Sequence, residues 1–209
     1  MDEIKNNEEL QPEERILAAA IEEFTTKGYD GTRMQSIADR AGISKSALHY
    51  YFRHKERLFK LVLDETVGKT LARLRFDIAG LDSIQAKLER GFREYYRAIN
   101  KNAKVVRFLF MEVYRNPDLI DRFLEESNFR FWIDGLNREL EQEYQAGRIR
   151  RIRAEQLILN MVSMCIFPHL GEKIIRKVMK LNNKEYSELL VEREDIILEF
   201  IQRALIREE

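Results

Sequence analysis

A basic and polar segment near the N-terminal end of the chain has the chemistry to bind a polyanion. Between Lys27 and Lys60 there are eight basic and three acidic residues, a local charge of +5 in a chain whose 36 basic and 36 acidic residues balance. Within this segment, KSALHY (45–50) carries an ammonium group, two hydroxyls and an imidazole. These groups suit hydrogen bonds to phosphate oxygens and to base edges. The segment therefore indicates a nucleic-acid contact surface.

The residues that most enzymes and metal sites require are scarce. The sequence has three histidines, and His49 and His54 are five residues apart, a spacing that does not place them on one helical face. Its one cysteine, Cys165, excludes an intrachain disulfide and is typical of a reducing compartment. It contains no Gly-rich phosphate loop and no G-x-S-x-G turn. We therefore expect no enzyme, no metal site and no cofactor.

Two short helices joined by a sharp turn must position the basic segment. In MQSIADRAGISKSALHYYFR (34–53), small Ala38 lets the second helix approach the first, and Gly42 tolerates the positive φ that the turn needs. The wedge that fixes the crossing angle is formed by Ile37, Ile43 and Leu48. This is the helix-turn-helix pattern, in which the second helix enters the major groove of DNA.

Polar residues at the helix starts agree with this pattern. Ser44 is predicted to cap the second helix. Residues 32–35, Thr-Arg-Met-Gln, have the form of a capping box, which predicts that the first helix begins near 32 or 33.

The helical period continues through the remainder of the chain. Three prolines and nine glycines among 209 residues leave few breaks, and we find no convincing strand. We expect an all-α protein with helices at 12–27, 32 or 33–41, 44–52, 55–76, 82–101, 103–115, 117–145, 154–167, 171–180 and 192–207.

The sequence gives no sign of a membrane segment. Residues 1–10 are acidic and polar, unlike a secretory signal. The longest apolar stretch, 157–170, is interrupted by polar residues and is shorter than the roughly 20 residues that a spanning helix needs. We expect a cytoplasmic protein without membrane association.

A longer stretch, RILAAAIEEFTTKGYDGTRMQSIADRAGISKSALHYYFRHKERLF (15–59), resembles the N-terminal domain of TetR/AcrR-family transcriptional regulators. The resemblance covers the first helix, the Gly-Tyr turn, the helix-turn-helix and the Tyr-Phe-x-x-Lys-Glu-x-Leu start of the fourth helix. It implies a helix-turn-helix DNA-binding domain at 11–57 and a helical effector-binding and dimerisation domain at 58–209. The second domain fits the family only by its size and helical pattern.

The resemblance also implies roles for individual residues. Gln35 and residues 45–47 fall where family members meet base edges, and His49 and Arg33 depart from the commonest family residues, Tyr and Thr. Imidazole can still donate to a phosphate, and Arg33 is expected to make a phosphate contact of its own. The predicted DNA-binding residues are Thr32, Arg33, Gln35, Ser44, Lys45, Ser46, Ala47, His49, Tyr50, Tyr51 and Lys55.

In the family, helices of the second domain enclose an effector cavity, and this region of the chain is rich in aromatic residues. Tyrosine, tryptophan and methionine are the better lining residues, because polar tips need partners and methionine is adaptable. The alternative for each of them is ordinary core. The predicted ligand-binding residues are Tyr95, Tyr96, Met111, Tyr114, Trp132 and Met164.

Two apolar stripes near the C-terminus match the helices that form a four-helix dimer interface in the family. The predicted interface residues are Leu157, Ile158, Met161, Cys165, Ile197, Phe200, Ile201 and Leu205. The alternative is that they pack within one chain. A helix-turn-helix protein needs a dimer to place two recognition helices about 34 Å apart on DNA.

Together these features predict a dimeric, sequence-specific transcriptional regulator that binds a palindromic site in double-stranded DNA. The expected mode is repression, released by a small, mostly apolar effector, although the sequence leaves the sign of control open. One alternative keeps the DNA binding without an effector. A second, remote alternative is a helical enzyme.

Overall fold

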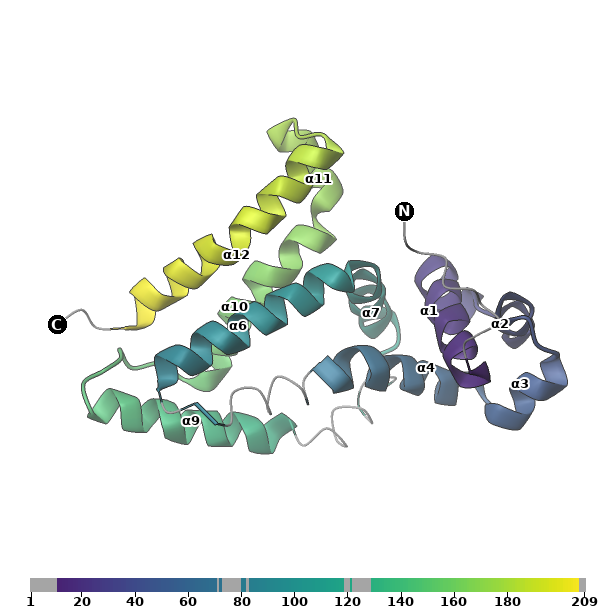
Figure 1. The fold of residues 1–209 in the computed structure, drawn as a ribbon, viewed down its shortest axis with the longest axis horizontal. Coiled ribbons are helices and arrows are strands. Elements are labelled where there is room, and N and C mark those ends of the chain that lie inside the picture. Colours follow the sequence, from purple (N-terminus) through teal and green to yellow (C-terminus); the bar gives the residue numbers. More distant parts are fainter. Residues whose placement is uncertain are drawn as a thin grey trace. The chain divides into compact units, whose positions relative to one another are not determined.

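The computed structural model describes residues 11–70, 72, 80–81, 83–118, 121 and 129–206. Within these residues the only extended pairing is an isolated bridge between Ile149 and Ile206, so the expected all-α fold is confirmed. The elements, labelled in Figure 1, are α1 (Pro12–Gly31), α2 (Met34–Ala41), α3 (Lys45–Tyr51), α4 (Lys55–Leu63), the π-helical turn η1 (Asp64–Gly68), α6 (Ile84–Lys101), α7 (Ala103–Arg115), α9 (Phe129–Gln145), α10 (Ala154–Leu170), α11 (Glu172–Met179) and α12 (Asn183–Leu205).

The chain forms two compact units that each contain two separate stretches of sequence. The head unit comprises Met1–Lys69 and Lys104–Glu126, and the C-terminal unit comprises Thr70–Ala103 and Ser127–Glu209. Helix α7 therefore belongs with the first four helices, although it follows α6 directly in the sequence. The two units are defined by which residues pack together. The DNA-binding domain predicted at 11–57 and the effector-binding domain predicted at 58–209 are defined by function, and this functional division stays a prediction.

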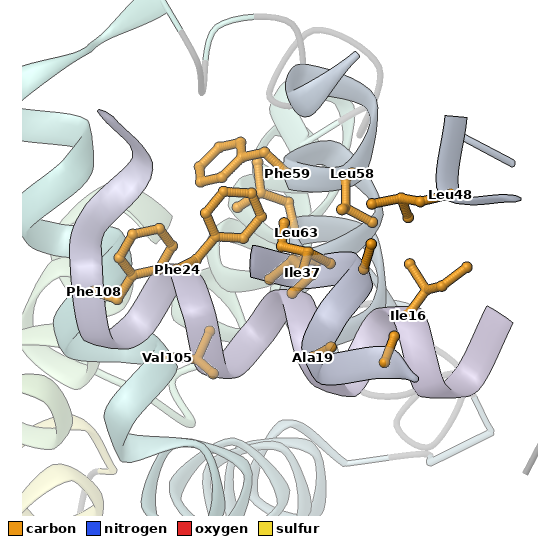
Figure 2. Close-up of a cluster of buried hydrophobic side chains, with 14 of the residues drawn as sticks. Ile16, Ala19, Phe24, Ile37, Leu48, Leu58, Phe59, Leu63, Val105 and Phe108 are labelled. Atoms are coloured by element: carbon orange, nitrogen blue, oxygen red, sulfur yellow. The ribbon is translucent and has the colours of Figure 1, made fainter. Parts of the chain in front are cut away.

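Aromatic packing holds α7 against α1 and α4 in the head unit (Figure 2). The Phe24 ring of α1 stacks on Phe108 of α7 at 6.0 Å between centroids and meets Phe59 of α4 edge-on at 5.7 Å. Ile37 and Leu48, two residues of the predicted wedge, are fully buried in the same core. Burial of this apolar surface fixes the helix-turn-helix relative to α1, α4 and α7.

The C-terminal unit is built on α6, α10 and α12, with α9 against them. Its core contains Phe92 of α6, Leu140 of α9, Leu157 of α10 and Ile197 of α12. At the surface, the Arg93 guanidinium of α6 joins α12 through ion pairs with Glu194 at 3.1 Å and Asp195 at 2.7 Å.

The predicted capping box at 32–35 is wrong. Arg33, not Thr32, is the N-cap of α2, and no side chain caps that helix. Thr32 is instead buried, and its hydroxyl donates to the carbonyl oxygens of Gly28 at 2.7 Å and Glu23 at 3.1 Å. The reason lies at Gly28, where φ of 74° breaks α1 and leaves carbonyl oxygens that the threonine hydroxyl can satisfy.

Two later boundaries also differ from the sequence-based expectation. Helix α10 runs through Pro168 to Leu170, and α12 begins at Asn183, nine residues before the predicted start at 192. The earlier start has a local cause, which is a capping box. The side-chain oxygen of Asn182 accepts from the backbone amide of Glu185 at 3.0 Å, and the Glu185 carboxylate accepts from the backbone amide of Asn182 at 2.7 Å.

Parts of four predicted helices lie outside the described residues. These are 71 and 73–76 of the helix expected at 55–76, 82 of the helix expected at 82–101, 119–120 and 122–128 of the helix expected at 117–145, and 207 of the helix expected at 192–207. In the part that the structure describes, no single helix has the length and apolar character to cross a membrane. The pair α10 and α11 would pass on length and composition only if taken together, and the two helices are bent by 74°.

Candidate nucleic-acid interface

The turn between α2 and α3 has the geometry that the sequence predicts. Gly42 has φ of 67°, and its amide donates to carbonyls at the end of α2. The hydroxyl of Ser44 accepts from the amide of Ala47 at 3.1 Å, so the predicted cap of α3 is confirmed. The glycine C-cap and the serine N-cap end α2 and begin α3 within three residues.

Helix α3 has one buried and one exposed side. Leu48 is buried in the head core, whereas Tyr50 is 86% exposed. The rings of Tyr50 and Tyr51 meet edge-on at 5.6 Å between centroids. The predicted DNA-contacting residues whose side chains are exposed are Arg33, Gln35, Ser44, Lys45, Ser46, Tyr50 and Tyr51, and those that are half-buried are Ala47, His49 and Lys55.

Three of these exposed side chains already have polar neighbours. The Gln35 amide nitrogen donates to the Asp39 carboxylate at 2.6 Å, which directs the amide oxygen away from that partner. The hydroxyls of Ser44 and Ser46 lie 2.9 Å apart. Both pairs keep hydrogen-bonding groups on the surface at the start of a helix.

Lys55 and Thr32 make contacts that the sequence did not predict. The Lys55 ammonium donates to the carbonyl oxygens of Tyr29 at 2.7 Å and Thr32 at 3.2 Å, and it lies 4.3 Å from the centre of the Tyr29 ring. With Thr32 buried, both predicted phosphate contacts hold the backbone that leads into α2. Their contact with DNA stays a prediction.

Glu23 of α1 changes the charge of the basic segment. Its buried carboxylate pairs with Lys27 at 2.6 Å and Arg40 at 2.9 Å. Burial alone would raise the pKa of Glu23, but the hydrogen bonds from these two cations outweigh it and hold the pKa below its ordinary value. Sequence reasoning missed this residue because it lies before the segment whose charge was counted.

Four other cations of the segment differ from Lys27 and Arg40. Lys45 and Arg33 are exposed and make no ion pair with any residue that the structure describes. The same is true of Arg53 and Arg57. These side chains can therefore approach phosphates without first breaking an internal pair.

The six predicted ligand-binding residues are divided between the two units. Tyr95, Tyr96 and Met164 lie in or against the core of the C-terminal unit, where Trp132 is half-buried beside Phe129. Met111 and Tyr114 lie on α7 in the head unit and are 58% and 92% exposed. Met111 also lines an open groove between α1 and α7.

Tyr95 and Tyr96 have different environments. The Tyr96 hydroxyl donates to the carbonyl oxygen of Leu190 at 2.5 Å. The Tyr95 hydroxyl has no hydrogen-bond partner among the described residues, and burial raises its pKa well above the ordinary value. Sequence reasoning could not separate them, because the separation depends on which side of α6 packs against α12.

Most of the predicted dimer-interface residues are already buried within one chain. Leu157, Cys165, Ile197, Ile201 and Leu205 are each no more than 5% exposed. Ile158 and Met161 are half-buried, whereas Phe200 is 63% exposed.

Comparison with known proteins places the helix-turn-helix in a family. Residues 16–62 match the model of "Bacterial regulatory proteins, tetR family". The chain is 44% identical over 73 residues to the HTH-type transcriptional regulator RutR of Escherichia coli (strain K12), a match that spans 34% of each chain and thus about a third of that relative's length. It is 23% identical over 187 residues to the fatty acid metabolism regulator protein of Bacillus subtilis (strain 168), covering 90% of this chain and 92% of that one.

Solved structures show the same fold along most of the chain. FadR from Bacillus subtilis in complex with stearoyl-CoA has a TM-score of 0.67 at 18% identity, covering 90% of this chain and 97% of that one. A TetR/AcrR-family regulator from Thermobifida fusca YX-ER1 has a TM-score of 0.60 at 22% identity, covering 89% and 97%. These solved structures share the fold, and the family match at residues 16–62 confirms the resemblance seen in the sequence. Through residues 16–62, which hold the helix-turn-helix, the chain is similar to the tetR family of bacterial regulatory proteins.

Proposed function

We propose that the chain is a dimeric, sequence-specific DNA-binding transcriptional regulator, acting as a repressor that an effector releases. The observation that carries the DNA-binding part is the two-sided character of α3. Leu48 anchors the helix in the head core, while Lys45, Ser46 and Tyr50 face solvent with their polar groups unburied. A short helix held in this way can enter the major groove without losing its packing.

The exposed groups divide into two kinds of contact. Lys45 and Ser46 at the start of α3 are suited to base edges, because recognition helices contact bases with their N-terminal residues. Arg33 and Tyr50 are suited to phosphates, which fix the register of the protein but carry no sequence information. We expect binding to weaken as salt rises, since each phosphate contact releases counterions.

Selection from the DNA of the source genome tests this function. Purified protein is incubated with sheared genomic DNA at about 150 mM salt, a concentration that suppresses weak charge-driven binding, and the bound fragments are sequenced. Enrichment of one or a few palindromic sites supports the proposal, and the Lys45→Ala variant should lose that enrichment. Bulk binding that shows no preferred site and is equal in both proteins would contradict it.

A charge-free stripe on α10 supports the dimer. After Glu155, the exposed residues of this helix are Gln156, Leu159, Asn160, Ser163, Phe167 and Leu170. None carries a charge, although 34% of the chain is charged. Phe167 and Leu159 are 63% and 58% exposed. An apolar, uncharged surface of this kind is typical of a protein interface.

Helix α12 extends this surface. Ile196 and Phe200 are about two-thirds exposed and lie on the flank that also carries Arg193. The Arg193 guanidinium donates to the carbonyl oxygen of Met164 at 3.4 Å, so this flank faces α10. We propose that Leu159, Phe167, Ile196 and Phe200, the dimer face, meet the same residues of a second copy about a two-fold axis.

For the effector, we propose a ligand with a long apolar chain, and stearoyl-CoA as the first compound to test. The hydroxyl of Tyr95, which like Met164 packs against the C-terminal core, has no partner among the described residues and is the polar group that such a ligand could satisfy. The fold shared with the stearoyl-CoA complex of Bacillus subtilis FadR supports this choice.

The effector is tested by adding stearoyl-CoA to the protein bound to its selected DNA site. We expect release of DNA, no release by coenzyme A alone, and a weaker response from Tyr95→Leu. DNA binding that stearoyl-CoA leaves unchanged would contradict this effector and favour a regulator that responds to another ligand or to none.

A further inference from the structure

A buried carboxylate joins α7 to the backbone that leads into the helix-turn-helix. Glu112 lies in α7 and is 2% exposed. One of its oxygens accepts from the backbone amide of Tyr29 at 3.0 Å, and the other accepts from the side-chain amide of Asn116 at 2.6 Å. Tyr29 follows the break at Gly28, where a Cβ added to the glycine would be in ordinary contact with the carboxylate at 3.6 Å.

The same peptide is held from its other side by α4. Lys55 donates to the carbonyl oxygens of Tyr29 and Thr32. Residues 29–32 are therefore held by two side chains: the Glu112 carboxylate accepts from the Tyr29 amide, and the Lys55 ammonium donates to the carbonyl oxygens of Tyr29 and Thr32. Arg33, the exposed N-cap of α2, comes directly after this held segment.

A stability role alone does not account for Glu112. The carboxylate has no ion-pair partner among the described residues, and both of its hydrogen-bond donors are neutral. Lys104, Arg107 and Arg115 line the same groove. A buried carboxylate whose hydrogen-bond donors are neutral is nevertheless costly, and an apolar side chain is often at least as stabilising in a packed site. What an apolar side chain cannot do is hold the Tyr29 amide.

The position of α7 in the chain indicates how a movement of this helix could reach the hydrogen bond between Glu112 and Tyr29. The chain passes from the C-terminal unit to the head unit between Ala103 and Lys104, within the first turn of α7. Helix α7 is then packed into the head core through Phe108 (Figure 2). A shift of α7 along its axis would withdraw the Glu112 carboxylate and leave both it and the Tyr29 amide without a partner.

We propose that Glu112 is a positioning residue for DNA binding, which couples the position of α7 to the presentation of Arg33 through the Tyr29 amide. This inference rests on the proposed DNA-binding function. A ligand that binds the C-terminal unit more tightly when α7 is displaced would lower DNA affinity through this contact.

The test compares variants in their affinity for the DNA site selected from the genome. Glu112→Leu removes the acceptor and should weaken binding about tenfold. Glu112→Gln keeps an acceptor oxygen and should stay within about twofold of the unaltered protein. Glu22→Gln removes a charge from the same α1–α7 groove without touching Tyr29, and serves as the control.

A double-mutant cycle separates positioning from loss of stability. The effect of Glu112→Leu should be much smaller in an Arg33→Ala background, because the contact it positions is already absent, and should add fully to Lys45→Ala on α3. If the Leu variant does not fold, Asn116→Ala loosens the carboxylate more mildly and should show the same pattern with a loss of about threefold.

The outcomes distinguish this inference from the proposed function. Full additivity with Arg33→Ala, or unchanged affinity in both Glu112→Leu and Asn116→Ala, would overturn the role of Glu112 while leaving DNA binding intact. An unaltered protein that selects no DNA site would overturn both. The inference would be supported if the effect of Glu112→Leu is non-additive with Arg33→Ala and additive with Lys45→Ala.

Discussion

Lys45 occupies the first position of α3, exposed and without an ion pair among the described residues. Its truncation therefore removes no ion pair or side-chain hydrogen bond among the residues that the structure describes. We expect Lys45→Ala to weaken specific DNA binding by about 1–3 kcal/mol if the ammonium reads a base edge. Titration of the selected DNA site measures this loss, and circular dichroism should show unchanged helix content.

A lysine far from α3 in the sequence provides the control. Lys177→Ala removes the same charge from an exposed position of α11. It should leave the affinity for the site within about 0.5 kcal/mol of the unaltered value. Equal losses in the two variants would show that Lys45 contributes only general charge.

Glu23 gives the head unit a stability that depends on pH. Its folded pKa lies below the ordinary value of 4.5, because hydrogen bonds from Lys27 and Arg40 favour the carboxylate. A depressed pKa contributes stability that is fully present above pH 4.5 and is lost as pH falls below it through the folded pKa. The free energy of unfolding should therefore decrease over that acidic range.

The Glu23→Gln variant isolates this contribution. Near neutral pH it should lower the free energy of unfolding by roughly 1–2 kcal/mol, a value reduced by the partial exposure of both cations. Urea unfolding at neutral pH and at pH about 3 measures the difference between the proteins, which should narrow in acid. A gap that stays constant across this range would rule out the carboxylate as its source.

At the scale of single elements, the start of α12 depends on a capping box that an apolar stripe does not reveal. Asn182→Ala removes the side-chain acceptor for the Glu185 amide and should destabilise the protein by about 1 kcal/mol. Asn183→Ala, one residue into the helix, is the matched control and should have little effect. Thermal unfolding of the two variants measures both changes, and equal midpoints would count against the cap.

These elements also show what a sequence can predict. Gly42, Ser44, Ile37 and Leu48 act within one turn and its two helices, so their local signals were sufficient for the helix-turn-helix. The capping box at 32–35 failed because the break at Gly28 offered the threonine hydroxyl other acceptors. A local motif is reliable only while no neighbouring element competes for the same group.

Contacts between residues that are far apart in the chain could not be predicted from the sequence. The bond between Glu112 and Tyr29 joins residues 83 positions apart, and no periodicity relates them. The same limit applies to the ligand residues: Tyr114 and Tyr95 are both tyrosines on amphipathic helices, yet they lie in different units. The same limit applies to the predicted dimer residues. An apolar stripe such as that of Ile197 and Ile201 can pack within one chain or against a second copy, and the sequence does not distinguish the two.

Burial within one chain decides which variants can test the dimer. Glutamate at Ile197 or Ile201 would place a charge inside the C-terminal core and unfold it. Phe167→Glu combined with Phe200→Glu changes only exposed positions of the dimer face. We expect this double variant to be a folded monomer, because two charges on each copy would be desolvated in the interface.

Sedimentation at several protein concentrations measures the assembly, and Phe131→Glu on α9, where the side chain is 73% exposed, makes the same substitution outside the dimer face. That control should remain dimeric. Affinity for a palindromic site should fall far more in the monomer than in the control, because one head then binds without the second head held nearby. A double variant that remains dimeric would move the interface away from α10 and α12, while a monomer with undiminished affinity would show that each head recognises its half-site alone.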